Sequence, residues 1–101
     1  MWNRRYFVSV VILGGNERME RKYADICKEY NYSAKVFTKI KSGLKGRIGN
    51  PDLLVMFTST MSHKMVRAAV AAINEDSVDI VHAPSSSASA LQNILQSRAE
   101  A

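Results

Sequence analysis

Residues 8–23 read Val-Ser-Val-Val-Ile-Leu-Gly-Gly-Asn-Glu-Arg-Met-Glu-Arg-Lys-Tyr, and this stretch decides the fold. Its first part is a run of apolar, largely β-branched residues, which favours a strand buried on both faces. Gly14 and Gly15 then predict a tight turn. Beyond the turn, apolar residues recur at helical spacing, at Met19, Tyr23, Ile26, Cys27 and Tyr30. The stretch therefore predicts a strand, a turn and a helix.

Three further ranges continue this alternation. Residues 33–38, 53–58 and 78–83 predict strands, and the range 53–58 is apolar on both faces. Strands that alternate with helices favour a parallel sheet with right-handed crossovers. We therefore expect one α/β domain over residues 1–101. It should be a small three-layer Rossmann-like parallel sheet of four strands, in the spatial order 2-1-3-4, with helices on both faces.

Two more helices are expected, one after each of the last two strands. Ser62 is a typical helix cap, and apolar residues follow it at positions Val66, Ala69, Val70 and Ile73. The last helix should start within residues 84–87 and bury Ala90, Leu91, Ile94 and Leu95. Residues 97–101 should fray.

The composition is that of an ordinary globular chain, with 47% hydrophobic and 23% charged residues. No apolar run approaches the roughly 20 residues that span a bilayer, and no cleavage pattern follows the first residues, so we expect a cytoplasmic protein. The single cysteine, Cys27, is expected to be a buried, inert thiol. Because the chain is short and its sheet has open edges, we predict a homodimer formed through an edge strand or the last helix.

Polar side chains follow three of the predicted strands, at the point where each strand ends. Because the carboxyl ends of parallel strands meet at one edge of the sheet, we expect these residues to surround one crevice. Helix N-termini at that edge favour an anion, although the same side chains could serve only as helix caps. The candidate residues are Gly14, Gly15, Asn16, Arg18, Thr58, Ser59, Thr60, Ser62, His63, Ser85, Ser86 and Ser87.

A basic segment follows the second predicted strand. Residues 39–52 contain several glycines and a proline, which predict a flexible loop. The loop could be merely solvated, or it could bind phosphate in a nucleotide or in nucleic acid. Its cations are Lys39, Lys41, Lys45 and Arg47, and they lie in a stretch that has no acidic residue before Asp52.

The sequence lacks the residues that several classes of enzyme require. A dinucleotide site needs Gly-x-Gly-x-x-Gly after the first strand and an acidic residue after the second, and neither is present. A receiver domain needs an aspartate at the end of the third strand, where Thr58 stands, and a thiol enzyme needs a cysteine where Gly14 and Gly15 stand. His63 could act as a base toward a nearby serine, but Glu17 is the only carboxylate expected at this edge. The sequence assigns no catalytic residue.

With its segments placed, the chain resembles a bacterial family known only as a domain of unknown function, number 2325. The resemblance covers nearly the whole chain and implies a Rossmann-like fold, but no activity. It also implies that Asn16, Arg18, Ser62, His63 and Lys64 could take part in whatever the family does at the strand ends. The matching stretches are Gly-Gly-Asn-Glu-Arg-Met at 14–19, Ile-Gly-Asn-Pro-Asp-Leu at 48–53, Ser-His-Lys-Met-Val at 62–66 and Ser-Ser-Ser-Ala-Ser-Ala-Leu at 85–91.

Four functions remain open, and no cofactor is identified. The leading hypothesis is a binding or regulatory module that holds a phosphorylated small molecule or nucleotide at the carboxyl edge of the sheet. The second is nucleic-acid binding through the basic segment from Lys35 to Arg47. The third is haem or metal binding through His63 and His82, which should come close because their strands are neighbours. The fourth is a protein-interaction module.

Overall fold

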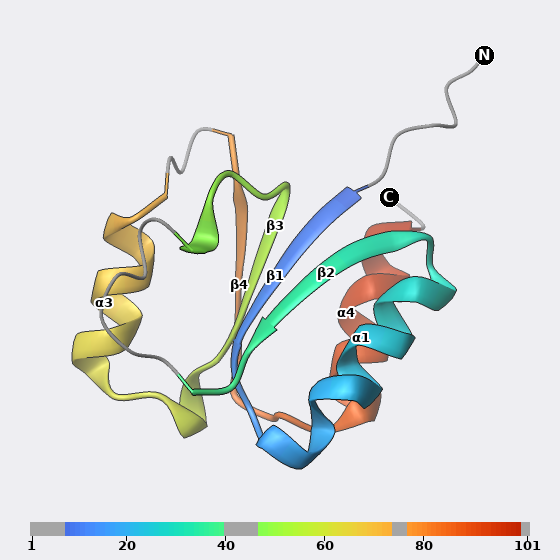
Figure 1. Cartoon of the computed structure of the whole chain (residues 1–101), viewed down its shortest axis with the longest axis horizontal. Coiled ribbons are helices and arrows are strands. Elements are labelled where there is room, and N and C mark those ends of the chain that lie inside the picture. The colour runs from blue at the N-terminus through green and yellow to red at the C-terminus, as the bar shows by residue number, and fades with distance from the viewer. Residues whose placement is uncertain (1–7, 40–46, 74–76, 100–101) are drawn as a thin grey trace.

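The computed structural model describes residues 8–39, 47–73 and 77–99 (Figure 1). Four parallel strands form its sheet, in the order β2-β1-β3-β4. This result confirms the predicted α/β fold and strand order. The strands are β1 (Val8–Gly14), β2 (Tyr32–Phe37), β3 (Leu53–Phe57) and β4 (Asp79–Ala83).

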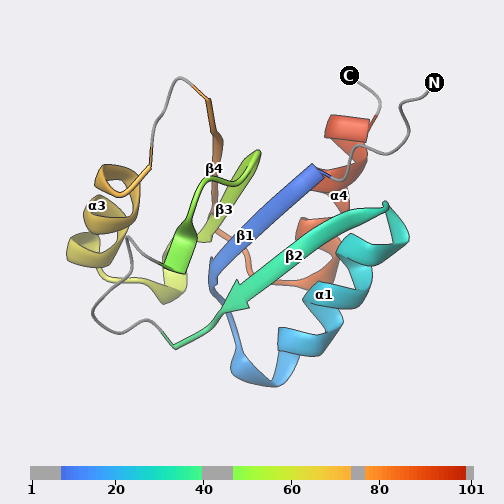
Figure 2. The ribbon, with the colours of Figure 1, turned by 45° about the horizontal axis from the view of Figure 1, so that its top comes forward.

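Helices cover the sheet on both faces. One face carries α1 (Glu20–Glu29) and α4 (Ala88–Ala99), and the other carries α3 (His63–Ala71), so the molecule has three layers (Figures 1 and 2). Short 3-10 turns, η2 (Glu17–Met19) and η3 (Thr58–Thr60), link β1 to α1 and β3 to α3. Within the described ranges, no helix combines the length and apolarity that crossing a membrane requires.

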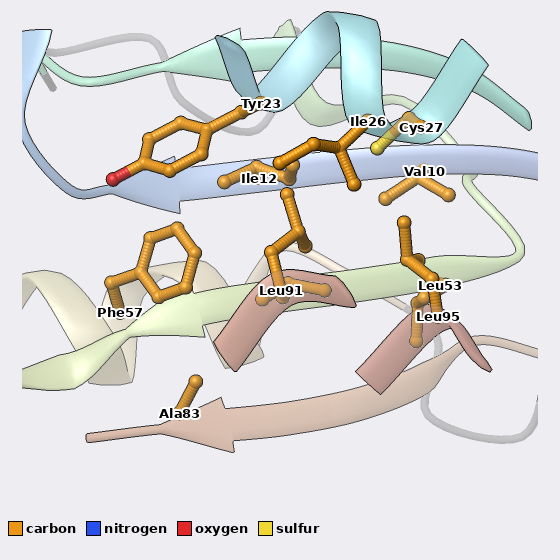
Figure 3. Close-up of a cluster of buried hydrophobic side chains, with 11 residues drawn as sticks. Val10, Ile12, Tyr23, Ile26, Cys27, Leu53, Phe57, Ala83, Leu91 and Leu95 are labelled. Atoms are coloured by element: carbon orange, nitrogen blue, oxygen red, sulfur yellow. The ribbon is translucent and has the colours of Figure 1, made fainter. Parts of the chain in front are cut away.

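The two central strands hold the core together because both of their faces are buried. In β1, Val10 and Ile12 face α1 and α4, whereas Val11 and Leu13 face α3. The buried side chains therefore form one cluster on each face of the sheet. Figure 3 shows the cluster on the face covered by α1 and α4, where side chains of these helices meet those of β1 and β3. This alternation explains why the sequence of β1 is apolar throughout rather than at every second position.

Several predicted element ends need correction. Thr58 belongs to the turn η3 and not to β3, and the last helix starts at Ala88 and not within residues 84–87. Residues 97–99 remain helical instead of fraying, and the Arg98 guanidinium lies 2.7 Å from the Asp79 carboxylate of β4. This ion pair gives the last turn of α4 a contact with the sheet, which the sequence pattern did not reveal.

Cys27 is fully buried in α1, as predicted, and burial raises the pKa of its thiol from 9.0 to about 11. The native thiol should therefore resist maleimide at neutral pH and react only after unfolding.

Between pH 9 and 11 the native state keeps a proton on Cys27 that the unfolded state has lost. The contribution of this thiol to the free energy of unfolding is therefore fully present below pH 9. It should fall by up to about 1.4 kcal/mol per pH unit between pH 9 and 11. Urea denaturation across this range measures the slope, which should shrink in Cys27→Ala; an unchanged slope would contradict the assignment.

Candidate functional site

The end of β1 is tied directly to the turn that follows β3. The Gly15 N–H donates to Thr60 Oγ1 at 2.7 Å, and the Thr60 hydroxyl donates to the Phe57 carbonyl at 2.7 Å. Gly14 and Gly15 have φ angles of +84° and +87°, and a Cβ at Gly14 would lie 2.7 Å from Thr60 Oγ1. Gly14 is therefore required by this close contact, whereas a Cβ at Gly15 would instead meet the rings of Tyr23 and Phe57. The Gly15 N–H, predicted to hold an anion, already has a partner.

Three of the predicted polar residues serve as caps in this structure. Asn16 Oδ1 accepts from the Arg18 N–H at 2.9 Å, and Ser62 Oγ accepts from the Met65 N–H at 3.1 Å. Ser87 Oγ accepts from the Ala90 N–H at 3.1 Å, which explains why α4 starts at Ala88. These bonds follow the capping alternative that the sequence left open.

Tyr23 has a role at this edge that the sequence analysis missed. Its buried hydroxyl donates to the Ser86 carbonyl at 2.6 Å and accepts from the Asn16 N–H at 3.4 Å. It thereby joins the connections that follow β1 and β4. The sequence does carry a signal for this role, because a buried tyrosine on a helix face needs a partner for its hydroxyl.

Arg18 lies in a pocket of about 430 Å³ beside the carboxyl end of β2. Charges in this pocket are largely compensated, since Lys39 Nζ lies 3.2 Å from Glu17 Oε2 and the Thr38 hydroxyl donates to the Glu20 carboxylate. Among the described residues that line it, two carboxylates thus accompany two cations, Arg18 and Lys39. This balance makes the pocket a poor place for a strongly anionic ligand.

His63 and His82 line a different pocket, of about 400 Å³, at the carboxyl ends of β3 and β4. Thr58 and Ser59 contribute hydroxyl groups to this pocket, and α3 begins at its rim. The first N–H groups of a helix have no acceptor within the helix, so those of α3 that Ser62 does not cap are available at this rim. Within the described part of the chain the other lining residues are Met61 and Val66, and no acidic residue is among them. The structure therefore places Arg18 and His63 in separate pockets.

A further pocket, of about 650 Å³, lies between α3 and β4. It shares His82 and Val66 with the pocket that His63 lines. Val70, Ala71 and Ile80 make much of its wall apolar, and Arg67 adds one cation. The two pockets together offer hydroxyls, imidazoles and a cation beside an apolar surface. We call them the histidine pocket and the β4 groove.

The basic segment falls only partly within the described residues. Lys35 and Arg47 are exposed, and Lys39 pairs with Glu17. Lys41 and Lys45 lie outside the described residues, so nucleic-acid binding by this segment stays a prediction. Among the described residues no three His, Cys, Asp or Glu side chains cluster as metal ligands would.

The comparisons with known proteins identify a family and name no ligand. Neither the curated proteins nor the solved structures include a match. One protein family matches over residues 9–98, which is nearly the whole chain, and its description is "Uncharacterized protein conserved in bacteria". The chain therefore belongs to this uncharacterised bacterial family, DUF2325.

Proposed function

We propose that the protein is a binding module that holds a phosphorylated small molecule or nucleotide in the histidine pocket. The observation that carries the proposal is the lining of this pocket, where two imidazoles and two hydroxyls meet at the start of α3. No carboxylate belongs to the described residues that line it. Hydroxyls, helix N–H groups and imidazoles donate to phosphate oxygens. Met61 and Val66 give an apolar surface for the remainder of the ligand.

The test is thermal unfolding with nucleotides, sugar phosphates and inorganic phosphate. A compound at about 100 times its Kd should add about 2.7 kcal/mol, which corresponds to a midpoint rise of about 10–20 °C. The variant His63→Gln should lose most of this rise, and Arg18→Gln should keep it because Arg18 lies in the compensated pocket. Loss in Arg18→Gln alone, or no rise with any compound, would contradict the proposal.

A second candidate is haem, because His63 and His82 share one pocket that adjoins the apolar β4 groove. A free metal ion usually needs three or more protein ligands, whereas haem supplies four nitrogens of its own and needs only one or two axial histidines. Val66, Val70 and Ile80 could face the ring, and Arg67 could pair with a propionate. Titration with hemin should give a Soret band that weakens in His82→Ala; a spectrum equal to free hemin would exclude this candidate.

A further inference from the structure

The edge of the molecule formed by β4 and α4 carries no net charge over most of its length. Residues 80–97 contain no Asp, Glu, Lys or Arg, in a chain that is 23% charged. The exposed residues of α1, by contrast, are all charged: Glu20, Arg21, Lys22, Asp25, Lys28 and Glu29. In the described part of α4 the exposed residues are all uncharged: Ser89, Gln92, Asn93, Gln96 and Ser97.

Apolar side chains lie along the same edge. Arg98 reaches Asp79 of β4, and Ala90 and Ile94 precede Arg98 at steps of four residues, so this flank of α4 leans toward β4. Both residues are only half-buried, as are Ile80 and Val81 of β4. We define the β4 edge strip as Ile80, Val81, His82, Ala90 and Ile94.

The main chain of β4 is prepared for another strand. In the sheet formed by residues 8–39, 47–73 and 77–99, β4 pairs with β3 alone and is therefore an edge strand. The Asp79 N–H donates to the Asp52 carbonyl at 3.0 Å, which turns the main-chain groups of Asp79 toward β3. Because these groups alternate along a strand, Val81 also faces β3, whereas Ile80 and His82 direct their N–H and C=O groups outward. In β2, the opposite edge strand, the exposed Lys35 opposes such pairing.

We propose that a second copy of this chain docks on the β4 edge strip, with the two β4 strands antiparallel about a two-fold axis at Val81. Ile80 of each copy then faces His82 of the other, and each such pair exchanges two main-chain hydrogen bonds. Each chain has a net charge of +5, so self-association requires a contact surface without like charges, and this strip provides one.

The pairing has a consequence for the β4 groove. Ile80 and His82 both line this groove, and in the dimer their counterparts in the second copy would lie directly beside them. The open side of the groove would thereby be covered by an identical apolar edge. The dimer does not depend on the proposed ligand, because it is defined by β4 and α4 contacts in the unliganded chain.

Sedimentation of the unliganded protein at micromolar concentration should give twice the chain mass of 11.3 kDa. Ala90→Lys would place two ammonium groups across the two-fold axis and should give the single-chain mass. Gln92→Lys adds the same charge to the flank of α4 away from β4 and should remain dimeric. A single-chain mass for the wild type, or a dimer that Ala90→Lys leaves intact, would overturn the proposal.

Amide hydrogen exchange provides a readout that needs no variant. In the dimer, the outward N–H groups of Ile80 and His82 should be protected about as well as that of Val81, which bonds to β3. The outward amides of β2 serve as the internal control and should exchange quickly. Fast exchange at Ile80 and His82 in a sample of dimeric mass would place the interface elsewhere, on another protein-binding surface, and would overturn the β4 pairing.

Discussion

Gly15→Ala should destabilise the protein by about 2–5 kcal/mol, which is a large part of the stability of a domain this size. The new Cβ would lie 2.8 Å from the Tyr23 hydroxyl oxygen, 2.9 Å from its ring and 3.0 Å from the Phe57 ring. Both rings are fully buried, and their centroids lie 5.1 Å apart. Neither ring therefore has space to move away from the new methyl group. The φ of +87° adds strain for any residue with a side chain.

Gly49→Ala is the matched control for this substitution. Gly49 also has a positive φ, of +66°, but no atom of the described residues lies within 4 Å of the position that a Cβ would take there. It should therefore show only the backbone cost, about 1–2 kcal/mol. Urea denaturation of both variants measures the difference. Equal losses would mean that backbone strain alone, and not the contact with Tyr23 and Phe57, makes Gly15 necessary.

Phe57→Ala should cost about 3–5 kcal/mol, because it opens a cavity in the buried core cluster. Phe57 is fully buried at the end of β3, and its ring packs against Tyr23 (Figure 3). The loss of this ring should also loosen the Tyr23 side chain, whose hydroxyl joins the β1 and β4 connections. Ligand binding at the carboxyl edge should then weaken together with stability.

Phe37→Ala removes the same ring from a half-buried position at the end of β2. Since less of that side chain leaves water on folding, we expect a loss of about 1–2 kcal/mol. Chemical denaturation with equal m values for both variants would allow the two free energies to be compared directly. A loss at Phe37 as large as that at Phe57 would contradict the greater contribution assigned to the fully buried ring of Phe57.

The sequence was sufficient to predict the sheet because hydrophobic periodicity reports burial directly. Val10 to Leu13 and Leu53 to Phe57 are buried on both faces, and such runs occur in the central strands of parallel sheets. The strand order followed from the doubly wound arrangement, which places the two strands that are apolar on both faces side by side. The start of α4 was predicted too early because Ser85 and Ser87 both have capping side chains, and only the bond from the Ala90 N–H selects Ser87.

The candidate site was less accessible to sequence reasoning. Topology brings Arg18, His63 and the serines to the same edge of the sheet, but it does not determine which of them share a pocket. That division depends on side-chain contacts between distant segments, such as Lys39 with Glu17 and Gly15 with Thr60. The proximity of His63 and His82 was expected, because β3 and β4 are neighbours, and both line one pocket.

The strand order also has a consequence for synthesis on the ribosome. β1 is complete at Gly14, but its partner β3 ends only at Phe57, after β2 and the intervening loop. At about 5–20 residues per second, several seconds separate the two strands. During that time β1, which is apolar on both faces, has β2 on one side and an open hydrogen-bonding edge on the other. The nascent chain should therefore be most prone to aggregation, and most dependent on chaperones, just before β3 leaves the exit tunnel.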